Sequence, residues 1–132
     1  MLNQNVLPLI ERREPVFRHD WQASEAWLSE FLRRRRVLVI GGAGSIGSTV
    51  VEIVFGLEPA ALHVVDVNEN GLADLVRQIR STKGYGVTDF RTICFDPLHI
   101  DADEMISRNG PYDIILSFAA VKHVRSEKDP FT

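Results

Sequence analysis

The chain has 132 residues, of which 45% are hydrophobic and 25% charged, and its formal net charge is −3. This length is typical of one domain, and this composition is typical of a folded globular protein and excludes a disordered chain. The net charge gives no reason to expect nucleic acid as a partner, and no run of about 18 apolar residues predicts a membrane span. Because no secretion signal is visible and Cys94 has no partner for an intrachain disulfide, we expect a cytoplasmic protein with Cys94 in its core.

Residues 1–35 are predicted to form an N-terminal arm and an amphipathic helix, ahead of a domain over residues 36–132. The helix is indicated by large apolar residues at helical spacing, namely Trp21, Trp27, Leu28, Phe31 and Leu32. We expect this face to pack on the domain or on a partner chain, and Asp20 or Ser24 to cap the start of the helix. Four arginines follow, at 33–36. We interpret them as cations that are favourable at a helix C-terminus and as part of a solvated linker, in preference to a patch that binds phosphate or a membrane surface.

The central feature of the sequence is an apolar run, Val37–Ile40, that leads directly into a glycine-rich loop and then into a helical pattern. The glycines fit both G-x-x-G-x-x-G and G-x-G-x-x-G, spacings that let a backbone turn sharply, approach a pyrophosphate and pack a helix on a strand. The free N–H groups of that helix's first turn then face the phosphates. No Lys-Ser or Lys-Thr pair follows, which excludes a P-loop. We therefore predict that a dinucleotide binds at Gly41, Gly42, Gly44, Ser45, Ile46 and Gly47.

An acidic residue ends the next predicted strand, Leu62–Val65, at the place where dinucleotide-binding proteins hold a ribose. This residue, Asp66, lies about 20 residues after Gly47, as that motif requires. A carboxylate here accepts hydrogen bonds from both ribose hydroxyls and repels a 2′-phosphate, which favours NAD over NADP. We predict that Asp66, Val67 and Asn68 bind the ribose; the alternative is a nucleotide-free turn with Asp66 as an ordinary strand-end residue.

The remaining chain continues the alternation of strands and helices. A helix capped by Asn68 or Asn70 is followed by a strand at Phe90–Phe95, a short helix and a strand at Tyr112–Phe118. Right-handed crossovers then give an α/β fold of the Rossmann type, with a parallel sheet in the order 3-2-1-4. Because ligands bind at the carboxyl ends of such strands, we expect further cofactor contacts from Asp96, Pro97, Ser117, Phe118, Ala119 and Ala120. For Asp96, a role as a turn or cap residue is an equal alternative.

Two further features concern partners. The four histidines are scattered, with none at the spacing of metal ligands, so no metal site is expected. The fourth predicted strand leaves an apolar edge, and we expect this edge to favour pairing with a second copy of the chain.

Three stretches of the sequence resemble known dehydrogenase/reductase motifs. The loop Gly41–Ser48 resembles the cofactor loop of extended short-chain dehydrogenase/reductases. Val64–Leu72 resembles the D-x-x-E-N-x-L signature, and Ala119–Phe131 resembles the A-A-x-K-H-V…E-x-N-P signature, of the CapD-like polysaccharide biosynthesis branch. That branch includes UDP-N-acetylglucosamine 4,6-dehydratases and epimerases. The resemblance covers about residues 36–131.

The resemblance implies a redox-neutral nucleotide-sugar dehydratase or epimerase. It implies a tightly held NAD, with NADP possible, and transient hydride transfer at C4 of a sugar such as a UDP-N-acetylhexosamine. It places Lys122 and His123 near the sugar. Several positions depart from the family's pattern, namely Ile40, Val67, Phe118 and Asp129, and the change at Val67 leaves the choice between NAD and NADP open.

The family's catalytic Tyr-x-x-x-Lys pair is missing from the chain. We therefore assign no catalytic residue and expect the cofactor-binding portion of a longer enzyme, inactive alone. The alternatives are a stand-alone NAD-binding regulatory or interaction module and, less favoured, a simple dehydrogenase that releases reduced cofactor.

Overall fold

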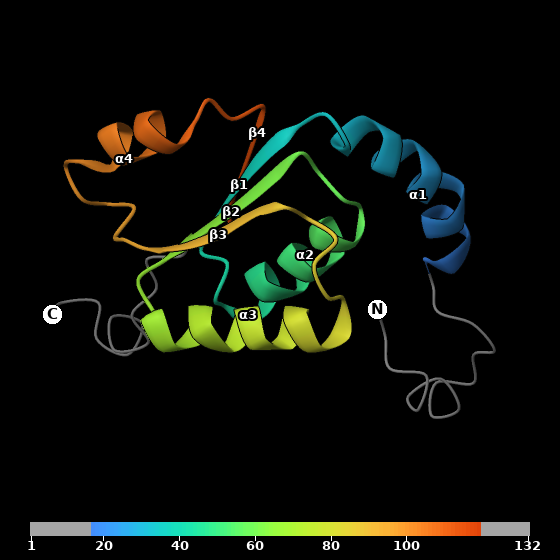
Figure 1. The fold of residues 1–132 in the computed structure, drawn as a ribbon, viewed down its shortest axis with the longest axis horizontal. Helices are drawn as coiled ribbons and strands as arrows, with labels where there is room; N and C mark the ends of the chain where they lie inside the picture. Colours follow the sequence, from blue (N-terminus) through green and yellow to red (C-terminus); the bar gives the residue numbers. More distant parts are fainter. Residues whose placement is uncertain (1–16, 120–132) are drawn as a thin grey trace, which may run out of the picture.

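The computed structural model describes residues 17–119, which form one sheet with helices around it (Figure 1). Strands and helices alternate after an N-terminal helix, as the sequence predicts. In chain order the elements are α1 (Arg18–Leu32), β1 (Arg36–Ile40), α2 (Ser45–Gly56), β2 (Ala61–Asp66), α3 (Glu69–Thr82), β3 (Asp89–Cys94), α4 (Ala102–Asn109) and β4 (Ile114–Ser117).

The four strands form a parallel sheet in the order β3-β2-β1-β4. β1 lies in the centre, where Val37 is in register with Leu62 of β2 and with Ile114 of β4. The chain thus builds one half of the sheet outward from β1 to β3 and then returns to the other side of β1. This order confirms the predicted Rossmann-type fold, in which the loop after β1 lies at the point where the strand order reverses.

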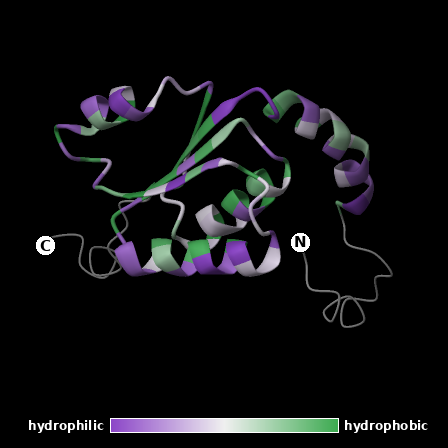
Figure 2. Cartoon of the chain, viewed as in Figure 1, coloured by the Kyte–Doolittle hydropathy of each residue, from purple (hydrophilic) through white to green (hydrophobic). Residues whose placement is uncertain are grey.

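The two central strands are buried on both faces. Val37, Leu38 and Val39 of β1 have no exposed surface, and Leu62 and Val64 of β2 are equally inaccessible. Figure 2 shows the apolar residues concentrated along these strands. Burial of both faces explains why β1 and β2 read as continuous apolar runs and not as an alternation of apolar and polar residues.

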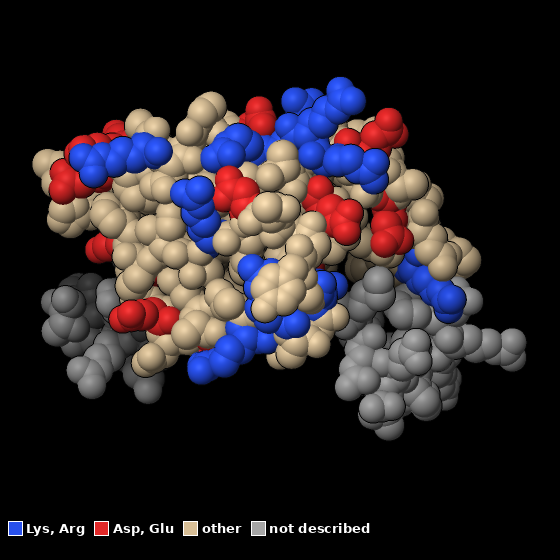
Figure 3. Space-filling model, viewed as in Figure 1, with Lys and Arg blue, Asp and Glu red and all other residues tan. Residues whose placement is uncertain are grey.

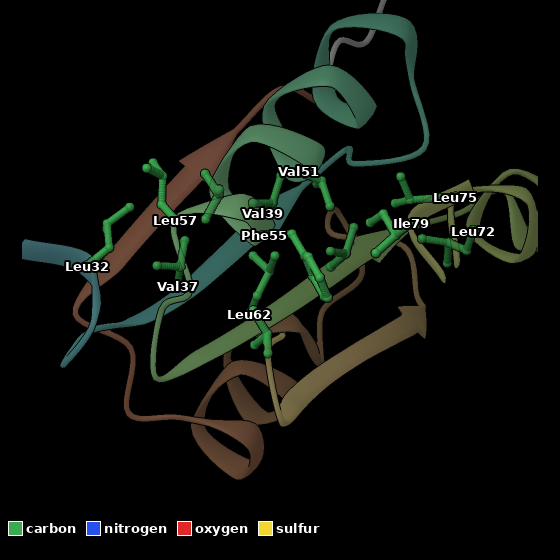
Figure 4. Close-up of a cluster of buried hydrophobic side chains, with 13 residues drawn as sticks. Leu32, Val37, Val39, Val51, Phe55, Leu57, Leu62, Leu72, Leu75 and Ile79 are labelled. Atoms are coloured by element: carbon green, nitrogen blue, oxygen red, sulfur yellow. The ribbon is translucent and has the colours of Figure 1, made fainter. Parts of the chain in front are cut away.

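Helices α2 and α3 cover one face of the sheet and α4 lies on the other side (Figure 1). The core between the sheet and the two helices is drawn in Figure 4. From the helices it receives residues spaced three or four apart, the period that places side chains on one face: Val51, Val54 and Phe55 of α2, and Leu72, Leu75 and Ile79 of α3. Phe55 also meets Phe90 of β3 edge to face, with 5.2 Å between ring centroids.

The predicted caps are confirmed for α3 and wrong for α1. The Asn68 side chain accepts a hydrogen bond from the Gly71 N–H at 2.9 Å, whereas Asn70 lies inside the helix. Helix α1 begins at Arg18, before either predicted cap, and no side chain caps it. Asp20 instead occupies the first turn, where its charge is favourable with respect to the helix dipole.

Only part of the apolar face predicted for α1 is buried. Leu32 belongs to the core, and Trp21 and Leu28 pack against it. Trp27 and Phe31, however, are 62% and 40% exposed. Packing on the domain is therefore confirmed for Trp21, Leu28 and Leu32, whereas Trp27 and Phe31 lie on a flank of the helix that the domain does not reach. Packing of these two rings on a partner chain, the other alternative, stays a prediction.

The expected burial of Cys94 is also wrong, since this cysteine is exposed. It ends β3, an edge strand on which no residue is fully buried. The predicted fourth strand is shorter than expected, at Ile114–Ser117. Before it, the Asp113 carboxylate accepts a hydrogen bond from the Arg36 N–H at 2.8 Å, and the Tyr112 hydroxyl lies 2.6 Å from His63 Nδ1. None of the helices in the described part of the chain is long and apolar enough to cross a membrane.

Candidate functional site

The glycine loop lies at the carboxyl end of β1 and makes a close passage beside the end of β4. Gly41 has a positive φ of 78°, and its N–H donates to the Val65 carbonyl of β2 at 2.8 Å. A Cβ atom at this position would lie 2.6 Å from the Ala119 nitrogen and 2.7 Å from the Phe118 carbonyl carbon. Both the backbone conformation and the neighbouring strand therefore require glycine here.

A second glycine lets α2 pack directly on the loop. A Cβ atom at Gly47 would lie 2.1 Å from the carbonyl oxygen of Gly41 and 3.0 Å from the Cα of Gly42. Since Gly47 is in the first turn of α2, its missing side chain sets how closely the helix start approaches β1.

Gly44 differs, because atoms of residues 17–119 do not fill the space beside it. A Cβ atom there would meet only the Gly41 carbonyl oxygen, at an ordinary 3.6 Å, and the φ of −72° suits any residue. The fold itself thus does not demand glycine at position 44. A ligand that approaches the backbone closely would demand it, as the middle glycine of this motif does beside a pyrophosphate.

The start of α2 offers unpaired N–H groups beside Gly44. The first backbone bond of the helix runs from the Ser48 N–H to the Gly44 carbonyl at 2.8 Å, so the N–H groups of Ser45, Ile46 and Gly47 have no partner within the helix. No side chain caps this end, and Ile46 is 69% exposed. Free N–H groups and the positive end of the helix dipole favour an anion such as a phosphate.

Asp66 ends β2 next to this loop and is held there by two backbone donors. Its Oδ2 accepts a hydrogen bond from the Ala43 N–H at 2.9 Å, and its Oδ1 accepts one from the Asn68 N–H at 3.0 Å. Each carboxylate oxygen retains a free lone pair. Asp66 forms no ion pair with any residue in the described range, so its charge is not neutralised by a neighbouring cation.

The other predicted contacts come from the same edge of the sheet. The Phe118 N–H donates to the Ile40 carbonyl at 2.7 Å, which brings Ser117, Phe118 and Ala119 alongside the glycine loop. Three exposed apolar side chains also belong to this edge. Val67 follows Asp66 in the sequence, and Leu98 and Ile100 follow β3. The structure thus brings the predicted residues from β1, β2 and β4 together, whereas Ala120, Lys122 and His123 lie outside the described residues.

Asp96 stabilises a local turn in this structure. Its Oδ1 accepts a hydrogen bond from the Leu98 N–H at 2.9 Å, and its carbonyl accepts one from the His99 N–H at 3.0 Å. These contacts agree with the alternative that the sequence left open, a turn residue ahead of Pro97. The side chain is exposed and keeps an unused oxygen, so a contact with an adenine ring stays a prediction.

A polar cluster around a buried histidine, at the opposite, amino end of the strands, was not predicted. His63 of β2 has no exposed surface; its Nε2 lies 2.9 Å from Asp89 Oδ1 and its Nδ1 lies 2.6 Å from the Tyr112 hydroxyl. A neutral imidazole with its proton on Nε2 satisfies both contacts, donating to Asp89 and accepting from Tyr112. A histidine inside the otherwise apolar β2 was the available sequence signal, because a buried polar side chain requires a partner.

Two groups of this cluster have shifted pKa values: that of Asp89 is lowered and that of Tyr112 is raised. The hydrogen bond from His63, with help from the charge of Arg91 and the hydrogen bond from Arg36, holds the pKa of the Asp89 carboxyl below its ordinary value against the effect of burial. Burial raises the pKa of the Tyr112 hydroxyl, which keeps it protonated as a donor. Arg36 joins the cluster through Asp89 at 3.3 Å and the Pro111 carbonyl at 2.8 Å. The cluster thus connects β1, β2, β3 and the segment that precedes β4.

Neither group of residues forms a complete catalytic centre. Across residues 17–119, no three His, Cys, Asp or Glu side chains lie close enough to hold a metal ion. Tyr112 is bound to a buried histidine, and the fourth position after it is Leu116, so it is not the tyrosine of a Tyr-x-x-x-Lys pair. The carboxyl edge of the sheet is therefore the candidate binding site, with a chemistry suited to a phosphate and a diol.

Comparison with known proteins identifies a family and similar proteins. The profile of a family described as polysaccharide biosynthesis protein matches residues 37–131, which include all of the sheet except Arg36. The chain is 31% identical over 105 residues to a Methanocaldococcus jannaschii protein named uncharacterized membrane protein MJ1061, covering 79% of the chain and 29% of that protein. It also resembles the X-ray structure of Pen from Bacillus thuringiensis, with a TM-score of 0.61 and 27% identity over 76% of the chain and 30% of Pen. The chain thus spans less than a third of the length of either relative.

Proposed function

The chain belongs to the polysaccharide biosynthesis protein family, and we propose that it forms the NAD-binding portion of a nucleotide-sugar dehydratase or epimerase in that biosynthesis. The observation that carries the proposal is the open space beside Gly44, next to three free N–H groups of α2 and the Asp66 carboxylate. These residues fit a dinucleotide, because a pyrophosphate needs close backbone approach and N–H donors while a ribose needs a hydroxyl acceptor.

Each part of the site has its own task in this proposal. The N–H groups of Ser45, Ile46 and Gly47 bind the pyrophosphate, and Asp66 accepts hydrogen bonds from the ribose hydroxyls. The two backbone donors on Asp66 fix its carboxylate before a ligand arrives, which reduces the entropy lost on binding. When bound, the nicotinamide supplies reversible hydride acceptance, suited to oxidising and then reducing C4 of a sugar.

Charge at the ribose site supports NAD as the cofactor in preference to NADP. A 2′-phosphate would meet the unneutralised Asp66 carboxylate, and the adjacent Val67 offers no cation to bind it. The Val67 side chain is 62% exposed, so it presents an apolar surface beside Asp66. We expect substitution of Val67 by arginine to improve NADP binding relative to NAD.

Calorimetric titration of the chain with NAD and NADP tests the cofactor assignment. We expect NAD to bind more tightly, and Asp66→Ala to weaken NAD binding by at least about tenfold, the loss of one or more hydrogen bonds to a charged acceptor. A matched control is Asp74→Ala, which removes an exposed carboxylate of α3 that pairs with Arg77, away from the site. Equal binding by the Asp66→Ala and Asp74→Ala variants would contradict the assignment.

The reaction class is tested on the longer protein that contains this chain. Incubation with UDP-N-acetylglucosamine is expected to give a 4-keto-6-deoxy or epimerised sugar, detected by NMR, without accumulation of free NADH. Accumulation of NADH in proportion to product would indicate a simple dehydrogenase instead. Failure of the nucleotide-sugar assay with retained NAD binding would overturn the reaction and leave the cofactor site in place.

A further inference from the structure

We infer that the C-terminal half of α1 and the arginines after it form a docking surface for an anionic lipid bilayer. The surface consists of Trp27 and Phe31 of α1 and of Arg33, Arg34 and Arg35, and we refer to it as the α1 surface. It lies away from the carboxyl edge of the sheet, at the side of the molecule where α1 leads into β1 (Figure 1). It is thus separate from the proposed cofactor site.

The aromatic part of the α1 surface is ordered although it is exposed. Trp27 and Phe31 are one helical turn apart and stack with 5.4 Å between ring centroids and 14° between their planes. They remain 62% and 40% exposed, while Trp21, Leu28 and Leu32 satisfy the packing of α1 on the domain. The fold does not use these two rings, and aromatic side chains of this kind favour the interface between water and lipid.

The basic part of the α1 surface directly follows the end of the helix. The Arg35 guanidinium lies 4.9 Å from the centroid of the Phe31 ring, so it continues the stack that Trp27 and Phe31 begin. Arg33 and Arg34 precede it in the sequence and are exposed. Figure 3 shows basic side chains gathered over the junction of α1 and β1, with acidic side chains nearby.

These arginines are available for an external anion. Among the described residues, none of Arg33, Arg34 and Arg35 is in an ion pair, whereas the exposed Arg77 and Arg108 each pair with a carboxylate of their own helix. The chain as a whole is acidic, with a net charge of −3, so the positive charge at this place is local. Exposed aromatic rings followed by a basic cluster match the chemistry of an anionic bilayer, which presents phosphates above an apolar interior.

Sedimentation with vesicles tests this inference on the full 132-residue chain. The vesicles consist of phosphatidylcholine alone or of phosphatidylcholine with phosphatidylglycerol, and we expect the chain to pellet only with the mixed vesicles. The variant Arg33→Gln/Arg34→Gln is expected to bind about thirtyfold more weakly, roughly fivefold for each arginine. The control Arg77→Gln/Arg108→Gln makes the same change in net charge and is expected to alter binding by less than about threefold.

The aromatic pair provides a second readout. Trp27→Ala/Phe31→Ala is expected to weaken vesicle binding roughly tenfold without changing the circular dichroism spectrum, because both rings are exposed. In a Trp21→Phe variant, Trp27 is the only tryptophan, and its emission should shift to shorter wavelength on the mixed vesicles.

Three results would overturn the inference: absence of pelleting with the mixed vesicles, equal weakening by the α1 and control arginine variants, or unchanged binding without the aromatic pair. Light scattering that shows self-association lost in Trp27→Ala/Phe31→Ala, with no vesicle binding, would assign the surface to a second copy of the chain instead.

Discussion

Replacement of Gly47 by alanine should destabilise the fold, because the added methyl group would collide with backbone and not with a movable side chain. The new Cβ would lie 2.1 Å from the Gly41 carbonyl oxygen, whereas real Cβ atoms essentially never approach closer than 3.0 Å. The start of α2 must therefore move about 1 Å away from the loop, which loosens the packing of α2 on the sheet.

The expected cost of this substitution is about 2–3 kcal/mol of unfolding free energy, in the upper part of the range for overpacked sites. Alanine also gains roughly 0.5–1 kcal/mol over glycine within a helix, and this gain is included as a partial offset. The measurement is urea unfolding followed by circular dichroism at 222 nm. The slope of unfolding free energy against urea concentration should equal that of wild type, which checks that the unfolded state is unchanged.

Gly44→Ala is the matched control three residues earlier. Its Cβ would make one ordinary contact of 3.6 Å, so we expect unfolding free energy within about 1 kcal/mol of wild type. If the space beside Gly44 holds a pyrophosphate, this variant should nevertheless lose most of its NAD affinity. A Gly47→Ala chain as stable as the Gly44→Ala chain would refute the reasoning from backbone proximity.

Three further predictions concern the scaffold around the site. Phe55→Ala should cost about 3–5 kcal/mol in urea unfolding, because this ring is almost completely buried in the core; a cost below about 1 kcal/mol would contradict that packing. The lowered pKa of Asp89 stabilises the fold above the ordinary carboxyl pKa, and this stability is lost as pH falls through the folded pKa; Asp89→Asn should therefore reduce the acid dependence of unfolding free energy measured between pH 6 and pH 3. If the slope of unfolding free energy against pH is the same in Asp89→Asn as in wild type, the Asp89 carboxylate does not contribute to the acid dependence. Ile115→Lys, on the exposed edge strand β4, should reduce the self-association of the chain measured by light scattering. A wild-type chain that is strictly monomeric would contradict the expectation that this edge pairs with a second copy.

The features predicted correctly from the sequence are those that depend on local pattern. Apolar runs at β1 and β2, helical spacing in α2 and α3 and the cap at Asn68 each reflect residues that are close together in the chain. The sheet order followed from right-handed connections between parallel strands. The spacing of the glycines likewise anticipated the close contact at Gly47, because this contact is made within the loop. The close contacts of Gly41 are with Phe118 and Ala119 after β4, and the glycine spacing does not indicate them.

The features that were missed depend on contacts between distant parts of the chain. His63 meets Asp89 and Tyr112, which lie 26 and 49 residues away, and neither partner is marked by a local motif. Trp27 and Phe31 have the spacing of a packed face, but the domain contacts only one side of α1. Trp21, Leu28 and Leu32 therefore pack on the domain, while Trp27 and Phe31 are exposed. Cys94 was assigned to the core from its apolar neighbours, whereas the position of β3 at the sheet edge leaves it exposed.

The central claim, that the loop after β1 binds a dinucleotide, is tested most directly by a nitrogen-15 NMR titration of the chain with NAD, a measurement that also detects weak binding. We predict that the amide signals of Gly44, Ser45, Ile46 and Gly47 shift together and saturably, and that the same shifts in Asp66→Ala require at least about tenfold more NAD. Signals of α4, on the other side of the sheet, should stay in place. Unchanged loop amides at millimolar NAD, in a chain whose spectrum shows it to be folded, would contradict the claim.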